Sequence, residues 1–410
     1  MPNQPLNILC ISRFFKGGDF MRSAKAEGNN VFLLTSKQLE HSEWPWESID
    51  ETFYMVEDEH GLWNHDHLIG GLAHKMRNTK FDVFAALDDF DVEHVAYLRE
   101  YFRIPGMGET TARYFRDKLA MRIKAQTEGV PVPAFTALFH NADIHKFTQN
   151  VPAPWLVKPR MQASAAGIKK IHNENQLWEH LAYLGGERHE YLLEKFAPGA
   201  VFHVDSLTTE GKVVFSRVSQ YLDTPFEVAH GGGIFRSITL ESGCEDDVAL
   251  RKLNEDVMRA FGMQYSASHT EFIKCNEDGK YYFLETASRV GGAHLAEMVE
   301  FASGINLWAE WARIECAACH GKKYTLPKTK DGHAGIIVSL CRYEYPDTSV
   351  FNDKEVVWRM NKKYHIGLIM QSKDRNKVKQ LLETYVEKVR DEFHASAPAK
   401  EKLVGDKGKS

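Results

Sequence analysis

The segment "HTEFIKCNEDGKYYFLETASRVGGAH", residues 269–294, decides the fold of this chain. Two runs rich in β-branched and aromatic residues flank the turn sequence "NEDG", which predicts a β-hairpin. Glu271 lies in the first strand and Glu285 in the second. If the hairpin is centred on Asp278, the two glutamates are opposite each other on one face, because both are equally far from residue 278. An even-length turn would instead place them on opposite faces.

Two glutamates in directly opposed positions would repel each other. Their Cβ atoms would be roughly 5 Å apart, a distance at which like charges destabilise a strand pair. A cation between them removes this penalty, and Mg²⁺ fits because it prefers oxygen ligands and completes its shell with water and substrate phosphates. We therefore expect Glu271 and Glu285 to bind Mg²⁺, with Mn²⁺ as an alternative ion. The alternative is a pair of glutamates that are too far apart on a solvated sheet face to interact.

The residues that follow Glu285 suit a polyanion. Arg289 comes four residues later, and Gly291 and Gly292 come next. An arginine binds carboxylate or phosphate through a fork of N–H donors. The glycines allow backbone N–H groups to approach an anion.

An earlier stretch, "PWLVKPRMQASAAGIKK" (154–170), carries complementary charge. Lys158 ends a short apolar strand, and the small residues of "QASAAG" can form a loop that covers phosphates. A second lysine, Lys118, lies in "RDKLAMR". Each lysine alone is typical of a protein surface. Together with the two glutamates, they favour a site for a magnesium-bound triphosphate.

The overall composition is that of a globular protein with more than one domain. The chain has 410 residues, of which 43% are apolar and 26% are charged, and a net charge of −5. The charge argues against a nucleic-acid-binding protein, and no apolar stretch is long enough to cross a membrane. The start of the chain lacks a secretory leader pattern, so we expect a cytoplasmic location. Six scattered cysteines indicate reduced thiols, and the C-x-x-C at Cys316 and Cys319 is typical of small residues on a helix face.

The order of strand and helix patterns predicts an α/β protein with α+β elements. Apolar runs at 7–12, 30–36 and 81–87 alternate with helical patterns such as 92–102, which indicates a parallel sheet. A long helix is expected within 104–129, followed by a smaller unit to 195. A polar linker at 326–334 then leads to a small α/β appendage. The expected domains are residues 1–115, 116–195, 196–325 and 335–394, with a disordered tail at 395–410.

Four of these stretches together resemble the ATP-grasp superfamily, specifically its carboxylate–amine (L-amino-acid) ligases. They are "ALDDFDVEHVAYLREYFRIPGMGETTARYFRDKLAMR", "WLVKPRMQASAAGIKKI", "YLLEKFAPGAVFHVDSL" and "HTEFI…YYFLETASRVGGAHLAEM", which cover roughly residues 80 to 310 in order. The resemblance implies an ATP-grasp fold. Its N-terminal parallel α/β domain would be the pre-ATP-grasp domain, 116–195 the small lid, and 196–325 the larger mixed-sheet catalytic subdomain with its C-terminal appendage.

The resemblance also implies roles for individual residues. The implied ATP contacts are Lys118, Lys158, the flap Ser164, Ala165, Ala166 and Gly167, the adenine hinge Glu194, Lys195, Phe196 and Ala197, and His203. Glu271 and Glu285 match the metal ligands, and Arg289 and Lys158 match catalytic residues. The substrate-side candidates are His230, Arg236, Arg289, Gly291 and Gly292.

Two positions depart from the family pattern. Ala287 stands where an asparagine usually completes Glu-x-Asn-x-Arg, which leaves the number of Mg²⁺ ions, one or two, open. The glutamate that often holds ribose is also missing. His203 or Asp205 could replace it, or the ribose could be held loosely.

The implied reaction joins a small carboxylic acid to an amine, both expected to be amino acids, through an acyl phosphate with release of ADP. One alternative is a nucleotide-binding protein without turnover, which Ala287 favours. Another is different ATP-grasp chemistry, such as carboxylation or phosphate transfer. The sequence leaves the oligomeric state open, although homodimers are common among the proteins it resembles.

Overall fold

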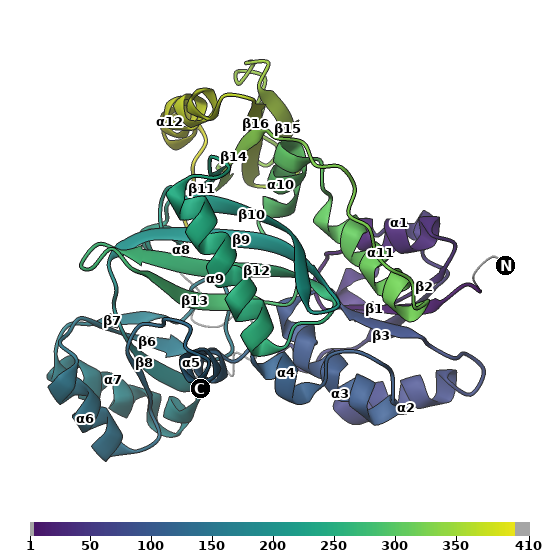
Figure 1. The fold of residues 1–410 in the computed structure, drawn as a ribbon, viewed down its shortest axis with the longest axis horizontal. Helices are drawn as coiled ribbons and strands as arrows, with labels where there is room; N and C mark the ends of the chain where they lie inside the picture. Colours follow the sequence, from purple (N-terminus) through teal and green to yellow (C-terminus); the bar gives the residue numbers. More distant parts are fainter. Residues whose placement is uncertain (1–3, 398–410) are drawn as a thin grey trace.

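The computed structural model describes residues 4–397. Its strands form three sheets, two of four strands and one of eight (Figure 1). Most of the predicted disordered tail, residues 398–410, lies outside the described residues. No helix in the described part of the chain is both long and apolar enough to span a bilayer.

The N-terminal unit is a parallel sheet in the order β3-β2-β1-β4, as the alternating pattern predicts. Its strands are β1 (Asn7–Ser12), β2 (Asn30–Ser36), β3 (Glu51–Met55) and β4 (Val83–Ala86). Its helices are α1 (Gly18–Ala26), η1 (Lys37–Leu39), η2 (Trp46–Ser48), α2 (His65–Lys75), η3 (Asp89–Asp91) and α3 (Val92–Phe102). Strand β3, which is half-exposed at the sheet edge, was not predicted from the sequence.

The long helix expected within 104–129 is two helices, α4 (Glu109–Arg113) and α5 (Lys118–Thr127). The prediction was wrong because Asp117 starts a new helix there. Its side chain accepts hydrogen bonds from the N–H groups of Leu119 and Ala120, which is the role of an N-cap residue. The break places Lys118 in the first turn of α5.

A small antiparallel sheet follows, in the order β5-β8-β6-β7. Its strands are β5 (Phe135–Ala137), β6 (Trp155–Pro159), β7 (Lys169–Ile171) and β8 (Tyr191–Lys195). The helices beside it are α6 (Asn141–Asn150), α7 (Glu174–Leu184) and η4 (Gly185–Glu190). In Figure 1 this unit lies below one end of the central sheet.

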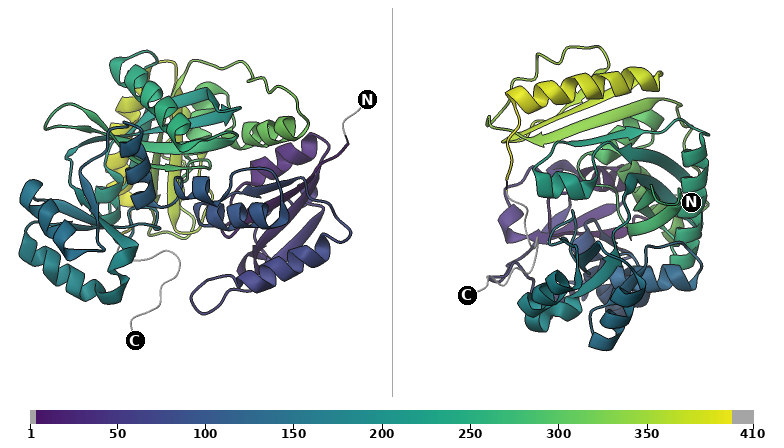
Figure 2. Two further views of the ribbon diagram at one scale, coloured as in Figure 1. Left: turned by 60° about the horizontal axis from the view of Figure 1, so that its bottom comes forward. Right: turned by 90° about the vertical axis from the view of Figure 1, so that its left-hand side faces the viewer.

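The central sheet has the order β13-β12-β9-β10-β11-β14-β16-β15. Its strands are β9 (Gly199–Thr209), β10 (Lys212–Tyr221), β11 (Phe235–Thr239), β12 (Ser266–Cys275), β13 (Tyr281–Ala287), β14 (His333–Leu340), β15 (Val356–Arg359) and β16 (His365–Ser372). Its helices are α8 (Pro225–Gly231), α9 (Glu245–Phe261), α10 (Leu295–Ser303), α11 (Leu307–Cys319) and α12 (Arg375–Glu392). Figure 2 shows α12 lying along the last strands of the sheet, where it packs against β14 and β16.

The strands of the expected C-terminal appendage therefore extend the central sheet, because β14 pairs with β11. The expected linker at 326–334 already contains the first residues of β14.

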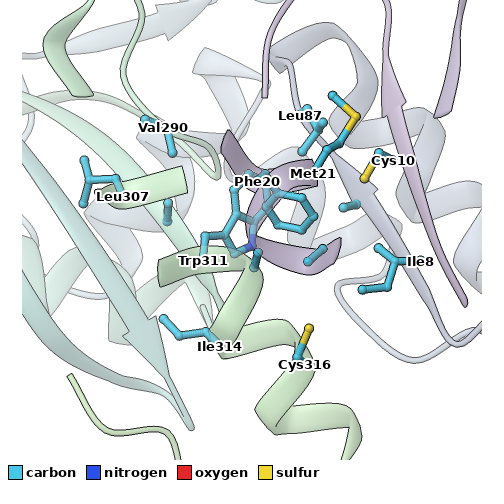
Figure 3. Packing of buried hydrophobic residues seen from close by; sticks show 14 of the residues in the cluster. Ile8, Cys10, Phe20, Met21, Leu87, Val290, Leu307, Trp311, Ile314 and Cys316 are labelled. Atoms are coloured by element: carbon cyan, nitrogen blue, oxygen red, sulfur yellow. The ribbon is translucent and has the colours of Figure 1, made fainter. Parts of the chain in front are cut away.

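Helix α11 joins the N-terminal unit to the rest of the molecule. It packs against α1, and the rings of Phe20 and Trp311 lie 5.0 Å apart, edge to face. Figure 3 shows this apolar cluster, with Phe20 and Trp311 at its centre and Met21 and Leu87 of the N-terminal unit on the side away from Leu307. Burial of such large side chains is the main source of stability at a contact of this kind. The packing of α11 against α1 on one side and against β9 and β12 on the other links the N-terminal unit to the central sheet.

Candidate active site

A cleft of about 810 Å³ lies between the small antiparallel sheet, the central sheet and the N-terminal unit. Thirteen of the predicted site residues line it: Lys118, Lys158, Ser164, Ala165, Ala166, Glu194, Lys195, Phe196, Ala197, Glu271, Glu285, Arg289 and Gly292. Five others do not: Gly167, His203, His230, Arg236 and Gly291. The fold thus brings most of the predicted residues together from segments far apart in the sequence.

Glu271 and Glu285 are direct cross-strand partners, as predicted, but for a different reason. Near the turn, Lys274 pairs with Tyr281 and Phe272 with Phe283. That register alone would put Glu271 opposite Leu284. A β-bulge at Leu284 adds the one residue that returns Glu285 to the position facing Glu271.

Glu271 is held in its ionised form by its neighbours. The Tyr221 hydroxyl donates a hydrogen bond to its carboxylate at 2.9 Å, and Nε2 of His269 lies 3.7 Å from Oε1. Burial alone would raise the pKa of Glu271. The hydrogen bonds and charge of His269 and Tyr221 outweigh this effect and lower that pKa.

Lys118 neutralises the second glutamate. Its Nζ lies 2.8 Å from Oε2 of Glu285 and donates to the carbonyl of Gln162 at 2.7 Å. Lys118 therefore links the carboxylate pair to the loop of small residues at 162–167. Cationic neighbours of this kind reduce the repulsion between Glu271 and Glu285.

The donor set fits a divalent cation with oxygen preference. Two carboxylates face each other at the edge of an open cleft, and one of them is kept anionic by its surroundings. Mg²⁺ needs only one or two protein carboxylates because water and phosphate fill the remaining positions. Ala287, at the end of β13, has no side-chain oxygen to add.

Lys158 is buried beside Glu194, with which it forms an ion pair. The other Glu194 oxygen accepts from Nε of Arg122 at 2.5 Å. Both carboxylate oxygens are therefore engaged in this structure, and a role of the Glu194 side chain in reading adenine stays a prediction. Burial opposes the charge of Glu194, but Arg122 and Lys158 outweigh it and lower its pKa.

The backbone of the hinge keeps one free donor. The N–H groups of Lys195 and Phe196 bond to the carbonyls of Ala134 and Pro154. Within the described residues, the N–H of Ala197 has no such acceptor. Ala197 lines the cleft, so its N–H can donate a hydrogen bond to a ligand bound there.

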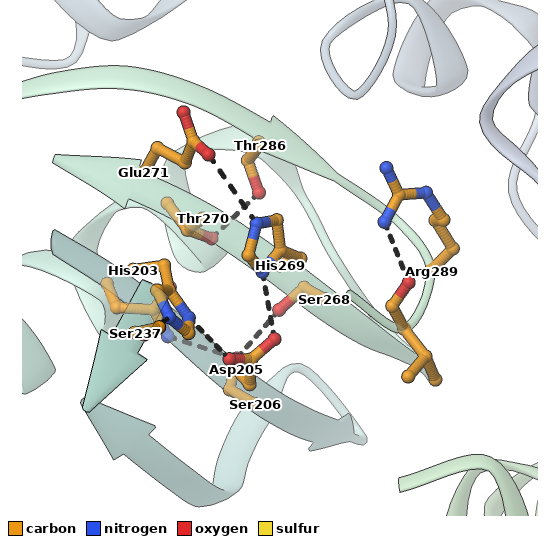
Figure 4. Close-up of polar contacts among 12 residues, drawn as sticks. His203, Asp205, Ser206, Ser237, Ser268, His269, Thr270, Glu271, Thr286 and Arg289 are labelled. Atoms are coloured by element: carbon orange, nitrogen blue, oxygen red, sulfur yellow. Dashed lines mark hydrogen bonds and ion pairs between the residues drawn. The ribbon is translucent and has the colours of Figure 1, made fainter. Parts of the chain in front are cut away.

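Arg289 forms an ion pair with Asp89, a residue of η3 that the sequence analysis did not single out. One of its terminal nitrogens donates to the Val290 carbonyl at 2.7 Å (Figure 4). Its Nε is buried without a partner in the described structure. Burial alone would lower the pKa of Arg289. The negative charge of Asp89 has the larger effect and raises this pKa above its usual value.

Comparisons with known proteins agree with this geometry. The L-arginine-specific L-amino acid ligase of Bacillus subtilis is 28% identical over 234 residues, which are 56% of each chain. A D-alanine–D-alanine ligase of Neisseria meningitidis is 21% identical over 66% of this chain and 80% of its own. The crystal structure of an L-amino acid ligase from Bacillus licheniformis superposes with a TM-score of 0.72 at 17% identity, covering 96% of this chain and 98% of its own. This chain has the fold of the ATP-grasp enzymes.

Other ATP-grasp structures match about as well. An N5-carboxyaminoimidazole synthetase from Staphylococcus aureus, complexed with ADP, has a TM-score of 0.70 at 16% identity over 94% of this chain and 99% of its own. A scan against models of protein families found no match. The chain spans about half the length of the Bacillus subtilis ligase, 56% of it.

Neither His203 nor Asp205 is placed to hold the ribose of ATP. Both are fully buried and do not reach the cleft. Nδ1 of His203 lies 2.7 Å from Asp205 Oδ2, and its Nε2 lies 2.8 Å from the Ser237 hydroxyl. With both ring nitrogens engaged, the prediction that His203 contacts ATP is wrong.

These side chains instead form a buried network behind the carboxylate pair (Figure 4). Asp205 bridges His203 and His269, and its Oδ1 lies 2.8 Å from Nδ1 of His269. In the described residues, these three are the one group of at least three side chains that could hold a metal ion. Burial would lower the pKa of His269, but Asp205 outweighs it and raises that pKa to about 10.

This network was not predicted from the sequence, although the sequence carries a signal for it. His and an acidic residue alternate as "HVD" at 203–205 and "HTE" at 269–271. Side chains two apart on a strand share a face. The register pairs His269 with Asp205 and Glu271 with His203.

Two of the five predicted substrate-side residues, His230 and Arg236, make other contacts. His230, on α8, lies 2.9 Å from the carbonyl of Ile168 through its Nε2, which ties α8 to the end of the small-residue loop. Arg236 donates twice to one oxygen of Asp223, at 2.9 and 2.7 Å. The cleft wall here is formed instead by neighbours such as Phe226 and Phe235.

Proposed function

We propose that this protein is an ATP-dependent ligase that joins a small carboxylic acid to an amine, both amino acids, through an acyl phosphate. The observation that carries the proposal is the opposition of Glu271 and Glu285 in a cleft that also holds Lys118 and Lys158. A carboxylate pair beside two lysines suits a magnesium-bound triphosphate and few other ligands. Similarity to L-amino acid and D-alanine–D-alanine ligases supports the choice of reaction.

In this proposal the two lysines change partners when the nucleotide binds. Lys118 bonds to Glu285 and Lys158 to Glu194. Both ammonium groups line the cleft and can turn to phosphate oxygens. Mg²⁺ bound by the glutamates supplies the positive charge that compensates the triphosphate. The N–H of Ala197 and the apolar side chains of Leu156 and Leu284 would hold the base.

The reaction would proceed in two steps. A substrate carboxylate oxygen attacks the γ-phosphorus as the bond to ADP breaks, which forms the acyl phosphate. The amine nitrogen then attacks the acyl carbon, phosphate leaves, and the nitrogen loses its proton to solvent. Arg289 lines the cleft, and in this proposal its guanidinium would stabilise the charge on the transferring phosphoryl oxygens.

Exclusion of water is the second task of the chain. The loop 162–167 lies against the cleft, and Lys118 and His230 contact the loop and its end through the carbonyls of Gln162 and Ile168. These contacts can hold the loop over the phosphates and so protect an acyl phosphate from hydrolysis. We assign residues 1–115 as the pre-ATP-grasp domain, 116–195 as the lid, and 196–325 as the catalytic subdomain.

The test mixes the protein with Mg-ATP and pools of amino acids and follows ADP release. A ligase gives ADP only with particular pools, together with a product whose mass equals acid plus amine minus one water. The non-catalytic alternative, which Ala287 favours, would bind ATP tightly and release no ADP with any pool. A carboxylase would release ADP only when bicarbonate is present.

A further inference from the structure

A second cavity, of about 860 Å³, lies between the N-terminal unit and the central domain. It is bounded by α3, the 104–108 loop, the start of β4, residues 262–266 and α11. It shares no lining residue with the first cleft. Cavities of this size with mostly apolar walls and a few converging polar groups are the usual form of small-molecule sites.

Arg99 of α3 is a half-buried cation in this wall. Its Nε donates to the Phe84 carbonyl at 3.1 Å, one terminal nitrogen donates to the same carbonyl, and the other donates to the Met107 carbonyl at 3.4 Å. No carboxylate in the described chain lies within 4.0 Å of its guanidinium. Arginine has five N–H donors, so two remain for an acceptor in the cavity.

Glu315 of α11 is the opposite charge in the same wall. Its carboxylate accepts a hydrogen bond from Nε1 of Trp311 at 3.0 Å. Among the described residues, no lysine, arginine or histidine nitrogen lies within 4.0 Å of this carboxylate. Burial raises the pKa of Glu315, an effect that the charge of Arg99 partly offsets.

We propose that this second cavity binds a free α-amino acid with an apolar side chain. Arg99 would bind its carboxylate through the two unused N–H donors, and Glu315 would bind its ammonium group. A zwitterion places both charges within one small molecule, which matches two opposite charges that share a cavity and do not pair directly. Leu6, Phe81, Val83 and Trp311 supply the apolar surface for the side chain. This site lies outside the proposed ligase chemistry and does not depend on it.

The cavity is nevertheless adjacent to the first cleft. Ser288 lines the second cavity, whereas its neighbours Ala287 and Arg289 line the first. The Ser266 hydroxyl donates a hydrogen bond to the Ser288 carbonyl at 3.2 Å. A ligand in the second cavity therefore contacts the strand end that carries Arg289 without entering the cleft.

Cys319 provides a local reporter because it is exposed and lines the second cavity. The protein is alkylated with N-ethylmaleimide, and mass mapping measures the rate of modification at Cys319. The half-exposed Cys244, at the start of α9, is the internal control. L-Leucine, L-methionine and L-phenylalanine are tested separately. At about ten times its dissociation constant, a bound amino acid should slow Cys319 alkylation about tenfold, because only the free form reacts. The rate at Cys244 should not change.

Two analogues and two variants separate the proposed site from a cavity that holds only solvent. Removing the ammonium group, as in 4-methylpentanoate, or the carboxylate, as in 3-methylbutylamine, should largely abolish protection. Glu315→Gln keeps an acceptor for Trp311 and removes the charge, and Arg99→Met removes the cation; both should abolish protection, with thermal unfolding as a check on folding. The proposal is overturned if none of the three amino acids protects Cys319, or if protection persists in Glu315→Gln, or if both analogues protect as well as leucine does.

Discussion

Asp89 and Arg289 are 200 residues apart in the sequence and form an ion pair at the cleft. Asp89 lies just beyond β4 of the N-terminal unit, and Arg289 lies just beyond β13 of the central sheet. The pair therefore joins the N-terminal unit and the central sheet at the cleft. It holds the guanidinium that the proposed reaction requires, and it makes the N-terminal unit part of the site.

Asp89→Asn should lower the rate of ADP formation about 10- to 100-fold and leave the ATP dissociation constant nearly unchanged. The amide can still accept a hydrogen bond from Arg289 but no longer holds it by charge, and small displacements of a positioned group have effects of this size. Substrate-dependent ADP release and ATP titration measure the two quantities. Asp66→Asn, at an exposed position of α2, is the matched control. An unchanged rate would show that Asp89 does not position Arg289.

Glu285→Gln should abolish ADP formation while the fold stays intact. The amide is a weaker ligand for Mg²⁺ and leaves Lys118 without its charged partner. Circular dichroism and thermal unfolding monitor the fold, and Glu277→Gln, exposed at the hairpin turn, serves as control. Near-normal turnover in Glu285→Gln would place the metal site elsewhere.

Lys158→Ala should weaken ATP binding about 10- to 100-fold, since a charge-assisted hydrogen bond contributes about 1.5–3 kcal/mol. Equilibrium titration with a fluorescent ATP analogue measures the change. Lys169→Ala, at an exposed position on β7, should bind ATP like the wild type. If Lys158→Ala keeps the wild-type dissociation constant, Lys158 does not contact phosphate.

Arg122→Met should destabilise the protein by about 3–5 kcal/mol, because it leaves the buried carboxylate of Glu194 with one cation instead of two. Nη1 of Arg122 also donates to the Leu284 carbonyl at the β-bulge. Urea unfolding gives the free energy. The double variant Arg122→Met/Glu194→Gln should lose less than the sum of the single changes, and strict additivity would mean that the two side chains do not interact.

His94 should make stability fall at acid pH. Burial, together with the charge of Arg13, lowers its pKa from 6.5 to about 3. The unfolded chain gains a proton below pH 6.5 and the folded protein does not until about pH 3, so stability is lost across that window as pH falls. The loss should reach about 3 kcal/mol by about pH 4.5.

Urea unfolding of the wild type and of His94→Gln over this pH range isolates the contribution of His94 from that of other groups. The Gln oxygen can accept the hydrogen bond that Arg13 makes to Nε2 at 3.2 Å. The variant should lose less stability than the wild type between pH 6.5 and 4.5. Parallel curves for the two proteins would contradict the shifted pKa.

Local patterns were sufficient to predict the elements that carry the site. The hairpin at 269–287, the strands at 7–12 and 30–36, and the helix at 92–102 lie where the apolar periodicity and turn residues indicated. Such signals arise within a few residues, where backbone preference and side-chain alternation act directly. The lysines, the small-residue loop and the glutamates could also be recognised, because their residue types and order are visible in the chain.

Errors arose where residues distant in sequence compete for the same partner. For Glu194, the sequence did not show that Arg122 and Lys158 would contact both of its oxygens. His203 was assigned to ATP, but Asp205 and Ser237 hold both of its ring nitrogens in the interior. A sequence shows that a polar side chain is present, whereas its partners depend on which strands the fold places side by side.

The sequence by itself determined that a hairpin would carry two glutamates, followed by an arginine and a glycine pair, because strand and turn formation depend on near neighbours. Only the tertiary structure decided that a bulge at Leu284 would bring those glutamates face to face, that Asp89 would hold Arg289, and that β14 to β16 would extend the central sheet. Each of these depends on hydrogen bonds and packing between distant segments, whose free energy is gained only when the whole chain has folded.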